Sequence, residues 1–210
     1  MRLILASTSP RRHDLLALLG VPFDITNPGD VERIDPGHSP RELASLLAER
    51  KVRSCAHRYP DAVIIGSDTL IAVDDDVLGK PEGSRDAERM LRRLSGRAHT
   101  VYTAVAVRRS GRQAPDTQVE AARVWFKPLS DAAVAGYLAT QEWEGKAGAY
   151  AIQGQGADLV DHIDGDFTSV VGLPLRLTAN LLRRCGIPMA VEVDRLYRET
   201  PYPNWKRFSP

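Results

Sequence analysis

Asp68 is the residue whose type and position point most directly to chemistry. It follows the apolar run Val63-Ile64-Ile65, which predicts a buried strand that ends near it. Ligands of α/β proteins gather at the carboxyl ends of strands, where a carboxylate can hold Mg²⁺ or accept a proton from water. An aspartate that only turns the chain is the alternative. The high cost of burying an idle carboxylate favours a functional role.

A loop near the N-terminus combines hydroxyl groups with arginines. Ser7, Thr8 and Ser9 follow a short apolar run and precede a predicted helix, and Arg11 and Arg12 come directly after. Unpaired N–H groups at a helix start attract anions, and arginine side chains form forked hydrogen bonds with phosphate oxygens. A capped helix with solvated arginines is an equally good interpretation of this segment alone. The chain has no GxxxxGK[ST] sequence, so this loop is not a P-loop.

Two lysines and a glycine-rich segment complete the candidate residues. Lys51 lies on a predicted helix, and Lys80 stands between a glycine and a proline. The segment from Gly145 to Gly154 has small residues that let backbone approach a ligand, and Gln153 in it could hydrogen-bond a base edge. Taken alone, the lysines fit a solvated surface and the segment fits a structural loop.

Alternating strand and helix patterns position these residues and predict an α/β fold with a mixed, twisted sheet and flanking helices. Serine at position 39 and glutamate at 42 form a predicted capping box at the start of the helix that carries Lys51. The expected strands are 2–6, 21–25, 62–65, 70–73, 99–107, 117–126, 159–163 and 167–171, and the expected helices start at Ser9, Ser39, Ser84, Ser130 and Pro174. We expect a loop over 27–38 and a loosely packed, peripheral tail over 187–210 after the last helix.

Composition excludes several classes of protein. The chain has 210 residues with 28 lysines and arginines against 27 aspartates and glutamates, a formal net charge of +1. That balance argues against a nucleic-acid coat protein or a polybasic membrane binder. The two cysteines, Cys55 and Cys185, have no metal-ligand spacing. Asp68 interrupts the apolar run 62–73, so we expect no membrane span and a cytoplasmic location.

Taken together and in order, six segments resemble the Maf family of nucleotide pyrophosphatases. They are LASTSPRR, GSDT, GKP, LSGRAHTVYT, GKAGAYAIQG and VVGLP, and the resemblance runs from Met1 to about Gly186. It implies a single domain over 1–210 with two lobes around a central cleft, akin to the inosine triphosphate pyrophosphatases. It also implies hydrolysis of (deoxy)nucleoside triphosphates to monophosphate and pyrophosphate, a divalent metal (Mg²⁺, or Mn²⁺), and a homodimer with no nucleic-acid or membrane partner.

The resemblance also implies roles for individual residues. Asp68 matches the family's catalytic aspartate. Glu32 is the best match to a second acidic residue that would share the metal with it. Phosphate binding falls to an arginine pair and two site lysines, helped by two serines of the first loop: Arg11, Arg12, Lys51, Lys80, Ser7 and Ser9.

Three positions are linked to base choice in this family, and here they are Arg12, Thr69 and Gln153. This combination resembles the branch that acts on dTTP and UTP, whereas the branch preferring 7-methyl-GTP has glutamine where Thr69 stands. Ser169 replaces an asparagine that is usual before VVGLP, which bears on base preference.

Two other functions remain as alternatives. An aspartyl-phosphate phosphatase also places its nucleophile after an apolar strand, but it needs a second aspartate two residues on, where this chain has Leu70. A non-catalytic nucleotide-binding regulator of cell division or septum formation would bind nucleotide without releasing pyrophosphate.

Overall fold

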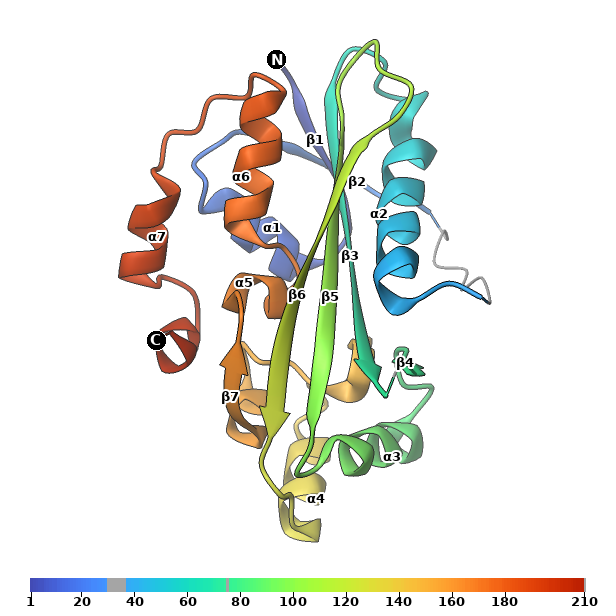
Figure 1. Cartoon of the computed structure of the whole chain (residues 1–210), viewed down its shortest axis with the longest axis vertical. Coiled ribbons are helices and arrows are strands. Elements are labelled where there is room, and N and C mark those ends of the chain that lie inside the picture. Colours follow the sequence, from blue (N-terminus) through green and yellow to red (C-terminus); the bar gives the residue numbers. More distant parts are fainter. Residues whose placement is uncertain (30–36, 75, 210) are drawn as a thin grey trace.

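The computed structural model describes residues 1–29, 37–74 and 76–209, and within them seven strands form one mixed sheet (Figure 1). The strands run in the order β2-β1-β3-β5-β6-β7, and β4 pairs with β3 off this path. The pairs β2-β1 and β1-β3 are parallel, and the remaining pairs are antiparallel. The bounds of the strands are β1 Leu3–Ala6, β2 Asp24–Thr26, β3 Val63–Val73, β4 Asp76–Leu78, β5 Ala98–Arg108, β6 Asp116–Phe126 and β7 Val160–Asp164. The predicted α/β class with a mixed sheet is confirmed.

Helices cover both faces of this sheet. The α-helices are α1 Pro10–Ala17, α2 Pro40–Ala56, α3 Ser84–Leu94, α4 Asp131–Ala139, α5 Phe167–Val171, α6 Leu175–Arg184 and α7 Val193–Glu199, and the 3₁₀ turns are η1 Ala147–Ala149, η2 Gln155–Leu159 and η3 Trp205–Phe208. In Figure 1, α2 lies on one side of the strands and α1, α5, α6 and α7 lie on the other. The sheet therefore separates two hydrophobic clusters, a small one under α2 and a larger one that includes α1, α5 and α6.

Alternation along the strands decides which side chain joins which cluster. Ile4 and Ile64 pack in the cluster under α2, whereas Leu3, Leu5 and Val63 pack in the larger cluster. This is the period-two pattern of a sheet buried on both faces, where every position is apolar. The same alternation fixes the direction of the polar residues that follow in β3.

The predicted break near Asp68 is wrong. The structure has one continuous strand, β3, and Asp68 is its sixth residue, not the residue that follows its end. Pairing with β5 extends from Ile64 to Ala72, and this long ladder holds residues of low strand propensity such as Gly66 in the strand. Gly66 is also needed there, because a Cβ would lie 2.9 Å from a methyl group of Val52 on α2.

The expected strand over 167–171 is also wrong, because these residues form the short helix α5. The carboxylate of Asp166 accepts the backbone N–H of Thr168 (2.8 Å) and so caps the first turn. All five residues of α5 are buried. Tertiary packing and the cap therefore outweigh the strand preference of Thr168, Val170 and Val171.

The tail is better packed than expected. Beyond Gly186 the chain forms α7 and η3, and Val193, Leu196, Trp205 and Phe208 are buried in the larger hydrophobic cluster. The indole of Trp205 is 2 % exposed. The expectation of a loose tail is thus corrected, while the division of the chain into one domain with two lobes stays a prediction.

Within the described residues, no helix has both the length and the apolar character needed to cross a bilayer.

Candidate active site

The candidate site lies at a gap in the sheet beside the middle of β3. On one edge of β3, β1 pairs with residues 63–65 and β4 pairs with residues 71–73. Among the described residues, no strand pairs with 66–70 on that edge. A cavity of about 660 Å³ opens there, and Asp68, Thr69 and Leu70 line it. This volume is in the range of small-molecule sites.

The loops around the gap supply the rest of the cavity wall. They are the β1–α1 loop, residues 27–29 after β2, the segment after β4 and the segment from Gly145 to Gln153, with α2 and α5 adding side chains. The expected site residues that line the cavity are Ser7, Ser9, Arg11, Arg12, Lys51, Asp68, Thr69, Lys80 and Gln153. Glu32, expected as an acidic and metal-binding residue, lies outside the described residues.

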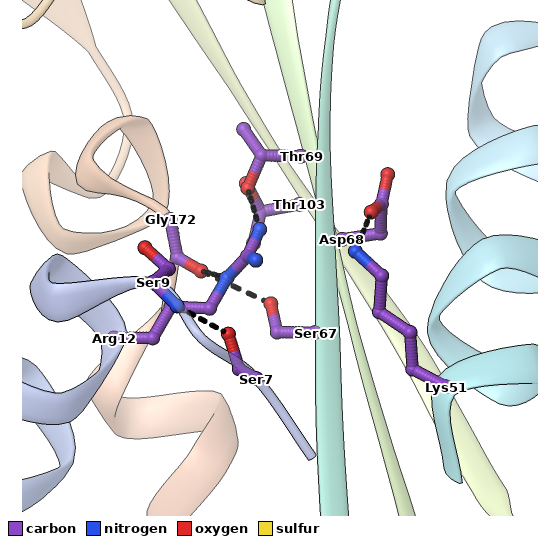
Figure 2. Close-up of polar contacts among 9 residues, drawn as sticks. All are labelled: Ser7, Ser9, Arg12, Lys51, Ser67, Asp68, Thr69, Thr103 and Gly172. Atoms are coloured by element: carbon purple, nitrogen blue, oxygen red, sulfur yellow. Dashed lines mark hydrogen bonds and ion pairs between the residues drawn. The ribbon is translucent and has the colours of Figure 1, made fainter. Parts of the chain in front are cut away.

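Asp68 and Thr69 point to opposite faces of the sheet, because successive side chains of a strand alternate (Figure 2). Asp68 faces α2, where its Oδ1 forms an ion pair with Nζ of Lys51. Both residues are buried, at 5 % exposure for Asp68 and 4 % for Lys51. A buried charge needs such a partner, so the pair explains how this carboxylate is held beside the cavity.

Lys51 is placed by α2. The predicted capping box at the start of this helix is confirmed: the Ser39 hydroxyl accepts the N–H of Glu42 (3.3 Å), and the Glu42 carboxylate accepts the N–H of Ser39 (2.9 Å). Gly66 lets the helix approach the sheet closely enough for Lys51 to reach Asp68.

On the other face of β3, Arg12 donates hydrogen bonds to two neutral acceptors of the described residues. Its Nε donates to the carbonyl of Gly172 (2.9 Å), and one terminal N–H group donates to the hydroxyl of Thr69 (3.2 Å). The hydroxyl of Thr103 on β5 lies 3.0 Å from that of Thr69, and the hydroxyl of Ser67 donates to the same Gly172 carbonyl (3.0 Å). Arg12 and Thr69, two residues expected to govern base choice, therefore form one hydrogen-bonded unit (Figure 2).

Gly172 has to be glycine for this unit to form. Its φ of +127° lies in a region that residues with a Cβ rarely adopt. A Cβ on it would also approach the hydroxyl of Thr69 to 3.3 Å. The glycine of VVGLP thus ends α5 and offers its carbonyl to Arg12.

The β1–α1 loop presents its groups largely as expected. The N–H of Ser9 donates to the hydroxyl of Ser7 (3.2 Å), and His13 braces the loop through the carbonyl of Ser7 (2.8 Å). Ser9 occupies the N-cap position of α1, but its side chain makes no capping hydrogen bond, contrary to its expected role as a cap. The first turn of α1 therefore keeps N–H groups without a side-chain cap at the cavity wall.

Arg11 is a half-buried cation, and no ion pair joins it to a carboxylate of the described residues. Burial, followed by repulsion from Arg12, lowers the pKa of Arg11 to about 10. Lys146 also lines the cavity, and its pKa is lowered by burial first and by Arg11 second, with Glu142 acting in the opposite direction. These cations repel one another, and the repulsion lowers the pKa of Arg11 and of Lys146. A polyanionic ligand would relieve this repulsion and is therefore favoured in the cavity.

Gln153 lies on the cavity wall with an unsatisfied group. Its side-chain oxygen is buried and makes no hydrogen bond to any described residue. A buried amide oxygen without a partner is costly, so a ligand donor at this place would be favourable. This observation agrees with the expected role of Gln153 in binding a base edge.

Tyr150 adds an aromatic wall to the cavity. Its hydroxyl lies 2.8 Å from Nε2 of His99, and burial lowers the pKa of His99 to about 3. The imidazole is therefore neutral at ordinary pH and acts as a hydrogen-bonding support of Tyr150.

The donor set at the cavity suits a metal that shares its ligands with a substrate. Asp68 is the only carboxylate among the described lining residues, and no group of three or more histidine, cysteine, aspartate or glutamate side chains gathers in the described part of the chain. Mg²⁺ is commonly held by one or two carboxylates together with substrate phosphates and water. Asp68 fits that arrangement as the protein's ligand.

Four residues of the site were not identified from the sequence. Ser67, Thr103 and Gly172 support Arg12 and Thr69, and Lys146 adds a positive charge. Each lies within a segment that carries the family resemblance, but a supporting role becomes visible only when the distant partners are known.

Comparisons with known proteins identify the family. The model of the family described as "Maf-like protein" matches residues 2–185. The chain belongs to the Maf-like protein family. Among its curated Maf relatives, a dTTP/UTP pyrophosphatase of Bacillus velezensis is 47 % identical over 186 residues, which are 89 % of this chain and 97 % of that protein. A dTTP/UTP pyrophosphatase of Symbiobacterium thermophilum is 45 % identical over 90 % of this chain and 96 % of that one.

Among solved structures, the Ham1 protein of Staphylococcus aureus matches this Maf-like chain with a TM-score of 0.42 and 13 % identity, covering 95 % of this chain and 97 % of that one.

Proposed function

We propose that this chain hydrolyses the bond between the α and β phosphates of nucleoside triphosphates, releasing a nucleoside monophosphate and pyrophosphate. The observation that carries the proposal is the charge pattern of the cavity. Arg11, Arg12, Lys51, Lys80 and Lys146 surround a cavity whose described lining contains one carboxylate, Asp68. That pattern suits a triphosphate, and the family relatives are named for the same class of reaction.

The phosphates take the cationic side of the cavity. Arg11, Lys80 and Lys146 neutralise the substrate and the charge that builds on the leaving pyrophosphate. The N–H groups at the start of α1 and the hydroxyls of Ser7 and Ser9 hold phosphate oxygens. A bound divalent metal, for which we propose Mg²⁺, would be held by Asp68 and would polarise the phosphate oxygens.

Asp68 serves as the base. Its carboxylate accepts a proton from a water whose oxygen forms a new bond to the α-phosphorus, and the bond from that phosphorus to the bridging oxygen breaks. Lys51 holds the carboxylate at the cavity through their buried ion pair. Glu32, named by the family resemblance, would add a second carboxylate at the metal.

For the base, we propose thymine or uracil, so that dTTP, UTP and modified pyrimidine nucleotides are substrates. Gln153, with its unsatisfied side-chain oxygen, and the unit of Arg12 and Thr69 provide groups that can hydrogen-bond a base edge. Removal of modified pyrimidine nucleotides would be the purpose of such an enzyme. The expected homodimer and cytoplasmic location stay predictions.

The test is a set of triphosphates in which pyrophosphate and orthophosphate are measured separately. The set contains dTTP, UTP, dCTP, dGTP, ATP and 7-methyl-GTP, each with Mg²⁺ and with Mn²⁺. We expect pyrophosphate as the first product and the highest kcat/KM with dTTP or UTP. Asp68→Asn purified in the same way controls for contaminating phosphatases. Orthophosphate as the first product would refute cleavage at the α–β bond, and preference for 7-methyl-GTP would refute the choice of base.

A further inference from the structure

The C-terminal segment, residues 187–209, lies outside the part of the chain that matches the family model, which ends at Cys185. The relative from Bacillus velezensis is aligned over 97 % of its own length but only 89 % of this chain. Five of its side chains are nevertheless buried in the larger hydrophobic cluster: Ile187, Val193, Leu196, Trp205 and Phe208. In Figure 1 it runs down beside α6 and ends next to α5.

Its aromatic side chains attach it to α5. The rings of Trp205 and Phe208 stack on that of Phe167, the first residue of α5, at centroid distances of 5.9 and 6.1 Å. The hydroxyl of Tyr197 donates to the carboxylate of Asp166 (2.6 Å), which caps the same helix. These contacts fix the helix that leads to Gly172, the residue that holds Arg12.

A second attachment reaches the loop that carries Gln153. The side-chain amide of Asn204 donates to the carbonyl of Ile152 and to the carbonyl of Gly154, both at 3.0 Å. These two carbonyls belong to the residues on either side of Gln153. An amide NH₂ group has two hydrogens, and here both form hydrogen bonds with the backbone on either side of Gln153.

A third attachment is near Arg11. Tyr202 is coupled to Arg11 and to Asp14 of α1, and its pKa is raised to about 12 by burial first and by Asp14 second. The C-terminal segment thus touches α1, α5 and the Gln153 loop, three of the elements that build the cavity.

The backbone of Asn204 indicates that its placement is specific. Its φ of +63° lies in the left-handed region, which asparagine tolerates better than most residues. In this conformation the chain turns into η3, and Trp205 packs on Phe167. Asn204 therefore connects the aromatic contact with the hydrogen bonds to the Gln153 loop.

We propose that the C-terminal segment supports the substrate site from outside the cavity, with Asn204 as a positioning residue that holds Gln153 for discrimination between bases. This inference rests on the proposed function for its kinetic part. Asn204 acts through the Gln153 backbone, so its loss affects the choice of base and leaves the phosphate chemistry at Asp68 in place.

The first experiment measures the loop without using activity. Asn204→Gly removes the amide while keeping a residue that adopts positive φ freely, and Asn204→Asp keeps the shape but removes both donors. Hydrogen exchange of the backbone amides at 151–155 should become at least about fivefold faster in both variants, because two hydrogen bonds that hold the loop are lost. Unchanged exchange in that loop would overturn the proposal.

The second experiment measures discrimination as the ratio of kcat/KM for dTTP to that for dGTP. In Asn204→Gly we expect this ratio to fall about fivefold to tenfold, mainly through KM for dTTP. In a Gln153→Ala background, Asn204→Gly should cause no further fall in the ratio, since it acts through that side chain. Arg207→Ala is the matched control, because it removes an exposed ion pair with Asp158 from the same segment.

The outcomes separate this inference from the proposed function. If Asn204→Gly lowers the melting temperature and slows all substrates equally, the segment has a purely structural role and the proposal fails. If the wild-type protein releases no pyrophosphate from any triphosphate, the proposed function fails, and the hydrogen exchange still decides whether Asn204 holds the loop.

Discussion

The two faces of β3 present different kinds of interaction to one cavity. On the α2 face, Asp68 meets a charged partner, Lys51, and both are buried. On the opposite face, Arg12 donates to the Thr69 hydroxyl and to the Gly172 carbonyl, and the Thr103 hydroxyl donates to that of Thr69. Two consecutive residues of β3 thus take part in different arrangements: Asp68 in an ion pair, and Thr69 in a network of hydroxyl and carbonyl groups around Arg12.

This difference suggests a division of labour. An ion pair places a strong, directional charge where a bond must be broken, whereas a network of hydroxyls and carbonyls can match the pattern of donors and acceptors on a base. Because the two sets lie on opposite faces, we expect a substitution on one face to leave the packing of the other intact. Of the four predictions below, those for Asp68 and Thr69 test this separation directly.

The largest expected effect is the loss of catalysis in Asp68→Asn. The amide cannot accept the proton of the attacking water, so kcat should fall about 10³-fold or more for every substrate. The ratio of kcat/KM between dTTP and dGTP should remain within about twofold, since the Thr69 face is unchanged. Steady-state kinetics with a melting curve as a folding control provide the measurement. Turnover above a tenth of the wild-type value would remove Asp68 from the chemistry.

The second prediction concerns the ion pair itself. Lys51→Met leaves the carboxylate of Asp68 buried beside an apolar side chain, which should cost about 3 kcal/mol of unfolding free energy. The double variant Lys51→Met with Asp68→Leu removes both charges and should recover most of that loss. Chemical denaturation of the two variants checks this. Equal stability of single and double variants would show that the pair does not behave as a buried unit.

The third prediction is that Arg11 destabilises the fold of the ligand-free protein but strengthens the binding of the substrate phosphates. Its pKa is lower in the folded protein than the ordinary arginine value, so the protonated side chain destabilises the fold at every pH below about 10, and the cost fades above it. At pH 8, Arg11→Met should therefore raise the melting temperature of the ligand-free protein by about 2–6 °C. It should also lower kcat/KM about 100-fold, because a phosphate-binding cation is gone.

Arg195→Ala, which changes an exposed i,i+4 pair on α7, controls for a general effect of removing an arginine. A lower melting temperature in Arg11→Met would contradict the prediction, because it would show that the charge of Arg11 stabilises the folded protein.

The smallest effect is expected at Thr69. Thr69→Val keeps the shape but removes the hydroxyl that accepts from Arg12, and discrimination between dTTP and dGTP should fall about tenfold or less with little change in kcat. Thr69→Ser keeps the hydroxyl and should retain most of the discrimination. A large fall in kcat with unchanged discrimination would contradict the separation of the two faces.

Elements encoded by local signals were predicted well from the sequence. The capping box at Ser39, the helix Ser84–Leu94 and the hairpin of β5 with β6 depend on residues close together in the chain. The apolar run 63–65 also directed attention to Asp68, which lines the cavity, although the strand continues beyond it. These features need no knowledge of distant partners.

The features that failed depend on contacts between distant segments. The continuity of β3 through Gly66 comes from the ladder with β5, and the helical form of Phe167–Val171 comes from burial and from the cap at Asp166. The packing of Trp205 depends on an aromatic partner that lies 38 positions earlier, at Phe167. The supporting role of Gly172 required the position of Arg12, which local patterns do not give.

The gap between β1 and β4 has a consequence for how the protein avoids aggregation. An open strand edge is a template on which another chain can add a strand. In the described part of the chain, the stretch of β3 without a partner strand on this edge is only 66–70; its residues 68–70 line the cavity, and cationic side chains surround them. A nucleotide can reach that edge, but an extended polypeptide would first have to displace the loops around it. The same opening that admits a small ligand is thereby closed to intermolecular strand pairing.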